Sequence, residues 1–189
     1  MTGWGTGMSF TTEQMRLIQD RLAGERNVLP PLDVVRAVAV LIGKDNLSEV
    51  ICNSQQDEKS TTWRVVGLLD SECLFTMEAF GGEHDWDAGT HKDAEGRVQV
   101  QLSACIRSLS DVSSLILTRA TAPGYEQARA LGLSAGQAEK PWDIEATWEI
   151  LWRDGSPSLA LLARTDAMTG ERAAAEAIVD KVRQVLAAR

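Results

Sequence analysis

Apolar and polar residues alternate most regularly in two stretches of the chain, residues 97–107 and 145–152. Successive side chains of a β-strand point to opposite faces of a sheet, so this alternation predicts strands with one apolar face. The apolar face of the first stretch holds Val98, Val100, Leu102, Ala104 and Ile106, and that of the second holds Trp148, Ile150 and Trp152. Each stretch therefore predicts a strand that packs one face against a core.

Turn-forming residues divide the remaining alternation into further short strands. We expect these strands at 47–53, 62–69, 73–80 and 113–121, with the second and third joined as a hairpin. The Asp154-Gly155 pair predicts a tight turn and a returning strand after residue 152. Residues 34–42 are rich in valine, and their β-branching and short length favour a strand, with a buried helix as the alternative.

Helices are predicted near both ends of the chain. Thr11 and Gln14 have the spacing of a capping box, in which each side chain bonds the backbone of the other residue, and they predict a helix over 11–23. Apolar residues at helical spacing predict a second helix over about 168–188. Acidic residues precede basic ones along that helix, which suits the helix dipole.

The predicted elements form an α+β protein with one antiparallel sheet of about seven or eight strands. We expect a flexible tail at 1–9 and a single domain over 10–189, with the sheet at about 33–163. In element order, residues 33–188 resemble the pleckstrin-homology-like barrels, and the resemblance implies a bent sheet plugged at one end by the C-terminal helix. The alternative is a helix-grip sheet, which wraps around its terminal helix and would enclose a ligand cavity.

Charge and composition narrow the classes of partner. The chain has 19 basic and 27 acidic residues, a net charge of −8, which opposes binding to nucleic acid and to anionic lipid. The longest apolar run, residues 34–42, is too short to span a bilayer, and the first residues lack the pattern of a signal peptide. The three cysteines are widely spaced and form no paired motif. We therefore expect a cytoplasmic protein with no membrane and no nucleic-acid partner.

An acidic loop at residues 81–96 contains the strongest candidate for a contact surface. Trp86 lies between Asp85 and Asp87, and an exposed aromatic residue in such a loop is typical of a protein interface. The alternative is a metal site, because imidazole and carboxylate ligands occur close together at His84, Asp87, His91 and Asp93. We expect the loop to be metal-free and to bind through Trp86, Asp85 and Asp87.

No combination of residues predicts catalysis. Residues 132–136 match the Gly-x-Ser-x-Gly pattern of hydrolases, but that pattern needs a preceding strand and a histidine further along the chain. A helix is predicted before this segment, and both histidines precede it. We therefore assign no catalytic residue and no cofactor.

The hypothesis that follows is a non-catalytic protein-binding or adaptor module. Its acidic surface favours a basic protein partner, and self-association into a homo-oligomer is compatible with the same pattern. The alternative is a small-ligand-binding protein or enzyme with a pocket in a helix-grip sheet, made metal-dependent by residues 84–93.

Overall fold

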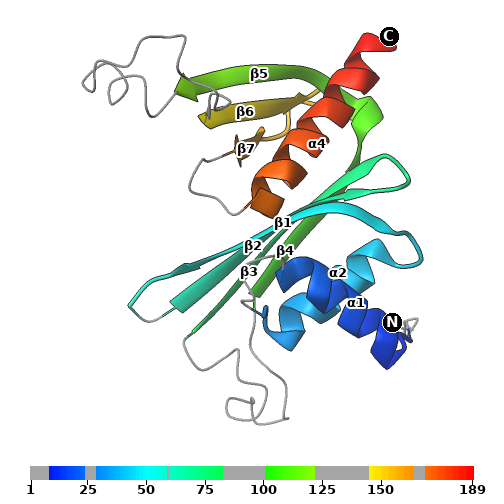
Figure 1. Ribbon diagram of the computed structural model, residues 1–189, viewed down its shortest axis with the longest axis vertical. Helices are drawn as coiled ribbons and strands as arrows, with labels where there is room; N and C mark the ends of the chain where they lie inside the picture. The colour runs from blue at the N-terminus through cyan, green and yellow to red at the C-terminus, as the bar shows by residue number, and fades with distance from the viewer. Residues whose placement is uncertain (1–8, 24–28, 59, 83–100, 122–144, 164–168) are drawn as a thin grey trace, which may run out of the picture. The chain divides into compact units, whose positions relative to one another are not determined.

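A computed structural model describes residues 9–23, 29–58, 60–82, 101–121, 145–163 and 169–189 (Figure 1). These residues contain three α-helices and seven strands. The chain divides into two compact units, Met1–Ser108 and Leu109–Arg189, here called unit 1 and unit 2.

The sheet of unit 1 contains four antiparallel strands in sequence order. They are β1 (Leu47–Gln56), β2 (Ser60–Leu69), β3 (Cys73–Gly82) and β4 (Gln101–Ser108). The expected hairpin of β2 and β3 is confirmed, with Val65 opposite Met77. The pairing of β3 with β4 is continuous, and it places Met77 opposite Ala104.

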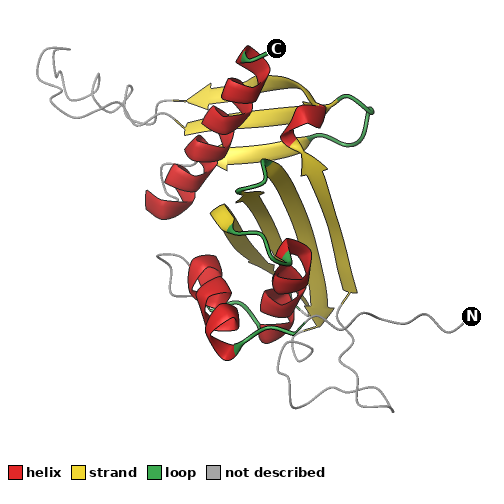
Figure 2. Ribbon diagram, turned by 90° about the vertical axis from the view of Figure 1, so that its right-hand side faces the viewer, coloured by secondary structure: helices red, strands yellow, loops and turns green. Residues whose placement is uncertain are grey.

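Two helices, α1 (Thr12–Ala23) and α2 (Leu32–Ile42), pack on one face of this sheet (Figures 1 and 2). The capping box of α1 is confirmed: the Thr11 N–H donates to Gln14 Oε1 at 2.8 Å, and the Gln14 N–H donates to Thr11 Oγ1 at 3.2 Å. The core between helices and sheet includes Val34, Val38, Trp63, Val65, Phe75 and Met77. Apolar burial on this one face therefore holds the two layers together.

Residues 34–42 form most of α2, so the favoured strand is wrong. The buried positions of α2 are Val34, Val35, Val38, Ala39 and Ile42, a spacing that places them along one side of a helix. Gly43 ends the helix with a positive φ of 60°. The preference of valine for strands is weak, and packing of a continuous apolar helix face overrides it.

The described residues of unit 2 form a short helical turn, a three-stranded antiparallel sheet and the terminal helix. Its elements are η2 (Leu109–Asp111), β5 (Val112–Thr121), β6 (Glu145–Trp152), β7 (Leu159–Ala163) and α4 (Thr169–Ala187). Helix α4 lies across one face of the sheet (Figure 2). The core of this unit includes Val112, Ile150, Leu161, Ile178 and Val182, each no more than 2% exposed.

The second alternating stretch of the sequence packs one face against a core, as expected. Ile150 is fully buried and Trp152 is 6% exposed. The guanidinium group of Arg183, on α4, lies over the Trp148 ring at 4.5 Å from the ring centroid, in a cation–π contact. The turn after β6 is also confirmed, because Gly155 has a positive φ of 72°.

The last residue of the chain is tied to the first residues of unit 2. The Arg189 guanidinium donates hydrogen bonds to the backbone carbonyls of Leu109, Ser110 and Val112. These bonds attach the end of α4 to the turn that precedes β5.

The α+β class, the antiparallel pairing and the two expected helices are confirmed. The single sheet is wrong, because the described strands form two sheets, of four and three strands, and no closed barrel. The physical reason lies at Leu109–Asp111, where η2 interrupts the chain and each neighbouring strand pairs only within its own sheet. A single domain over 10–189 stays a prediction, and most of the expected tail, residues 1–8, lies outside the described residues.

Candidate functional site

The residues that the sequence singled out lie outside the part of the chain that the structure describes. This holds for Asp85, Trp86 and Asp87, for the alternative metal ligands His84, His91 and Asp93, and for residues 132–136. Across the described ranges, no group of three or more histidine, cysteine or acidic side chains is arranged to hold a metal ion. The contact surface and the metal site in residues 81–96 therefore stay predictions.

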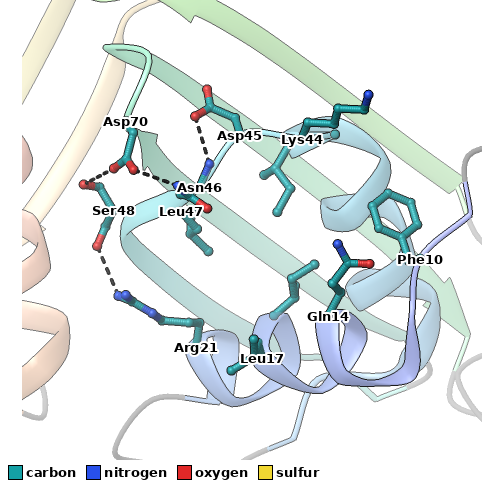
Figure 3. A pocket seen from close by; sticks show the side chains of 13 residues that line it. Phe10, Gln14, Leu17, Arg21, Lys44, Asp45, Asn46, Leu47, Ser48 and Asp70 are labelled. Carbon is teal, nitrogen blue, oxygen red and sulfur yellow. Dashed lines mark hydrogen bonds between the residues drawn. The ribbon is translucent and has the colours of Figure 1, made fainter.

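Two hollows formed by described residues of unit 1 share no lining residue. The first, here called the α1 pocket, has a volume of about 520 Å³ and lies between α1, the turn at 43–46 and the start of β1 (Figure 3). Its apolar lining residues are Phe10, Leu17, Ile18, Ile42 and Leu47. Its polar side chains are those of Gln14, Arg21, Lys44, Asp45, Asn46, Ser48 and Asp70. The pocket can therefore contact both apolar and polar groups of a ligand.

Hydrogen bonds join the walls of the α1 pocket. The carboxylate of Asp70 accepts from Asn46 Nδ2 and from Ser48 Oγ, each at 3.1 Å. From helix α1, the Arg21 guanidinium donates to the backbone carbonyl of Ser48 at 3.2 Å. Figure 3 shows these bonds along one side of the pocket. Since they connect α1, β1 and the turn after β2, the pocket is formed before any ligand enters.

The two charged residues of the turn at 43–46 differ in their partners. A hydrogen bond from the Ser71 hydroxyl, followed in importance by one from the Asn46 backbone N–H, lowers the pKa of Asp45 below its ordinary value of 3.8. The ammonium group of Lys44 has no hydrogen-bond or ion-pair partner among the residues described. Asp45 thus accepts hydrogen bonds from its neighbours, while Lys44 donates to none of the described residues.

The second hollow, here called the α2 groove, has a volume of about 450 Å³ and lies between α2 and strands β3 and β4. Its lining is mainly apolar and consists of Asp33, Arg36, Ala37, Val40, Leu41, Met77, Leu102 and Ala104. Val40 is 58% exposed and Leu102 is 51% exposed. Large apolar side chains therefore face water along this groove.

The register of β4 explains why these apolar residues border the groove. Leu102, Ala104 and Ile106 pair opposite Ala79, Met77 and Phe75, three residues buried beneath the helices. The alternation in the sequence thus placed Leu102, Ala104 and Ile106 correctly on one face. It gave no sign that this part of the face is uncovered, because coverage depends on the side chains that α2 presents to β4.

Asp33 gives the α2 groove an unusual polar group. Its Oδ1 accepts from the Arg36 guanidinium at 3.3 Å. Its Oδ2 is buried and, among the described residues, has no hydrogen-bond partner. A buried acceptor without a partner costs free energy, about 1–3 kcal/mol, so a donor that reached Asp33 would be favoured.

The side chains of the two hollows can be compared with those that common catalytic sites require. The lining residues include no histidine and no cysteine, so they do not combine a nucleophile with an imidazole base. Ser48 donates its hydroxyl hydrogen bond to Asp70 and thereby helps to connect the walls of the α1 pocket.

No protein-family model matches the chain, and comparisons with curated proteins and with solved structures found no match. None of the described helices combines the length and apolar character that crossing a membrane requires.

Proposed function

We propose that this protein is a non-catalytic protein-binding module, in which β4 and the α2 groove bind an extended segment of a partner protein. The observation that carries the proposal is the row of apolar side chains on β4. Leu102 is 51% exposed and Ile106 is 45% exposed, although both lie on the face that forms the core elsewhere in the same sheet. The side chains of a strand added at the edge of β4 would pack beside them.

The edge of the sheet at β4 favours strand addition. Among the described strands of unit 1, β4 is the last and pairs only with β3. Its sequence from Gln101 to Ser108 has no proline and a single charged residue, Arg107, and its pairing with β3 contains no bulge. Exposed edges usually carry such features as protection against pairing, so their absence on β4 supports binding of another strand.

The chemistry of the groove defines the segment that would bind. Side chains of a strand alternate between faces, so every second residue of the segment would lie beside Leu102, Ala104 and Val40 and should be apolar. A lysine or arginine near Asp33 would supply the donor that Asp33 Oδ2 lacks. The net charge of −8 also favours encounter with a basic partner.

The remaining expectations form part of the same proposal. Trp86, with Asp85 and Asp87, is proposed as a second contact with the partner. A cytoplasmic location is supported by Cys52, Cys73 and Cys105, which are all free thiols. For the fold we propose a pleckstrin-homology-like order of elements, supported by four strands in one sheet, then three in another, then a terminal helix. The helix-grip sheet with a ligand pocket is the competing proposal.

Selection of random-sequence peptides on the immobilised full-length chain tests the function. We expect enriched peptides to carry apolar residues at every second position and at least one lysine or arginine. The variant Leu102→Asp should weaken their binding by about tenfold or more, since it places a charge within the apolar groove. Affinity is measured by fluorescence anisotropy of the labelled peptides.

The matched control is Leu162→Asp. Leu162 is a strand leucine of unit 2 with nearly the same exposure, 49% against 51% for Leu102. Binding should be unchanged in this variant. Equal loss in both variants, or peptides without alternation, would contradict the proposal. So would a dimer, detected by light scattering, that Leu102→Asp dissociates, because a second copy would then be the occupant of the groove.

A further inference from the structure

We propose that the α1 pocket binds a small amphipathic carboxylate, a molecule with an apolar body and an anionic head. This site is separate from the protein-binding surface on β4, with which it shares no lining residue.

The apolar body would be bound by the helix side of the pocket. Leu17 is 60% exposed although it belongs to an amphipathic helix with a buried side. Phe10 and Leu17 line the pocket together with Ile18 and Leu47. Figure 3 shows Phe10, Gln14 and Leu17 on the α1 side of the pocket, and Lys44 and Asp45 on its opposite side. An apolar ligand body would remove this surface from water.

The hydrogen-bonding groups of the pocket select for an anionic head. Both oxygens of Asp70 already accept hydrogen bonds, from Asn46 and Ser48. Asp45 accepts from Ser71 and from the backbone of Asn46. Unused donors also remain in the pocket, because Lys44 has no partner among the described residues and Arg21 donates there only to the Ser48 carbonyl. An anionic head could accept hydrogen bonds from these donors.

The formal charges of the lining argue for a small ligand and modest affinity. Arg21 and Lys44 are balanced by Asp45 and Asp70, so the anion would be bound by direct hydrogen bonds and not by a strong positive field. The pocket volume of about 520 Å³ suits a molecule of this class. A cationic head would compete with Asn46 and Ser48 for Asp70 and would be repelled by Lys44, and a neutral alcohol would bond Lys44 without the attraction between opposite charges.

The experiment compares three probes with the same apolar chain: octanoate, octanol and octyltrimethylammonium. Each is titrated into the full-length protein by calorimetry, with amide chemical shifts recorded in parallel. We expect octanoate to bind most tightly and to shift the amides around Lys44 and Leu17. The variant Lys44→Glu should weaken octanoate binding about tenfold, a change of about 1.4 kcal/mol in binding free energy. Leu17→Asp should have an effect in the same direction.

The matched control is Arg16→Glu, which makes the same change of charge as Lys44→Glu, at a position on α1 that lies outside the pocket. The Arg16 side chain is 81% exposed and does not line the pocket, so octanoate binding should persist. Lys44→Met, which keeps the length of the side chain, separates loss of charge from loss of folding. Equal binding of the three probes, or equal loss in Arg16→Glu and Lys44→Glu, would overturn the proposal.

Failure of this proposal is distinguishable from failure of the protein-binding function. Leu102→Asp should leave octanoate binding unchanged, and Lys44→Glu should leave binding of the selected peptides unchanged. Loss of both activities in either variant would contradict two separate sites.

Discussion

Strands β4 of unit 1 and β6 of unit 2 have the same apolar alternation and opposite degrees of coverage. In β6, Ile150 is fully buried beneath α4. In β4, Ile106 is 45% exposed, although it lies on the helix-covered face of its sheet. The side of α2 near β4 presents Ala37, which is small, and Arg36, which is polar and pairs with Asp33. Coverage of an apolar strand thus depends on the size of the side chains opposite it.

The largest effect is expected from deleting α4, the helix that covers the sheet of unit 2. Ending the chain at Asp166 deletes α4, whose buried residues are Ala174, Ala175, Ile178, Val179 and Val182. Each larger side chain contributes about 1.5–3 kcal/mol on burial, against a total stability of about 5–15 kcal/mol for a typical protein. We expect unit 2 to unfold, seen as loss of methyl chemical-shift dispersion for Ile150. A truncated chain that keeps this dispersion would show that α4 is dispensable.

A pair of identical substitutions compares the two strands directly. Ile150→Ala should lower the free energy of unfolding by about 2–5 kcal/mol, because it leaves a cavity in a closed core. Ile106→Ala should cost less than about 1 kcal/mol, since the side chain is already half in water. Urea denaturation of both variants measures the difference. Equal losses would mean that Ile106 is covered in solution.

Gly67 tests how tightly the buried core of unit 1 is packed. A Cβ at this position would lie 2.1 Å from Cε1 of the fully buried Phe75 ring, so Gly67→Ala should cost about 1–3 kcal/mol through overpacking. Gly155→Ala, in open space at a positive φ, should cost about 1–2 kcal/mol through backbone strain. Adding Phe75→Leu should reduce the cost of Gly67→Ala alone. A double-mutant cycle by urea denaturation distinguishes these causes.

Filling the α2 groove should bury the apolar face of β4, as the apolar face of β6 is already buried. Ala37→Leu adds apolar volume beside Leu102, and we expect a gain of about 0.5–2 kcal/mol in the free energy of unfolding. The same variant should abolish binding of the selected peptides. Stabilisation without loss of peptide binding would place the peptide elsewhere.

The smallest effect is expected at the turn beside the α1 pocket, which belongs to neither strand. The folded protein lowers the pKa of Asp45, so this carboxylate stabilises the fold above its ordinary pKa of 3.8, and the contribution is lost as the pH falls. Asp45→Asn should therefore be less stable than the unchanged protein at neutral pH. The difference in urea midpoint should shrink below pH 3.8 and vanish in stronger acid. A constant difference would assign the effect to shape and not to charge.

Local signals in the sequence predicted local structure well. The capping box of Thr11 and Gln14, the positive φ of Gly155 and the shared face of Trp148 and Ile150 all follow from interactions between near neighbours. The favoured strand over residues 34–42 failed because β-branching is a weak preference, which helix packing overrides.

Neither hollow of unit 1 could be predicted from the sequence. The α1 pocket combines α1, the turn at 43–46 and Asp70, and the α2 groove combines Asp33 with Leu102. These residues are far apart in the chain, so only the tertiary fold brings them together. The residues that sequence reasoning favoured, Trp86 with its neighbouring aspartates, carry strong local signals of a different kind, namely loop composition and charge.

The bonds from Arg189 to the first residues of unit 2 have a consequence for protein engineering. One arginine side chain reaches from the last residue to the carbonyls of Leu109, Ser110 and Val112, so the two ends of unit 2 are near neighbours. A module whose ends meet can be inserted into a surface loop of another protein, or circularly permuted, with little strain in the host. Unit 2 is therefore suited to insertion into another protein, because both of its ends can be joined at one site in the host chain.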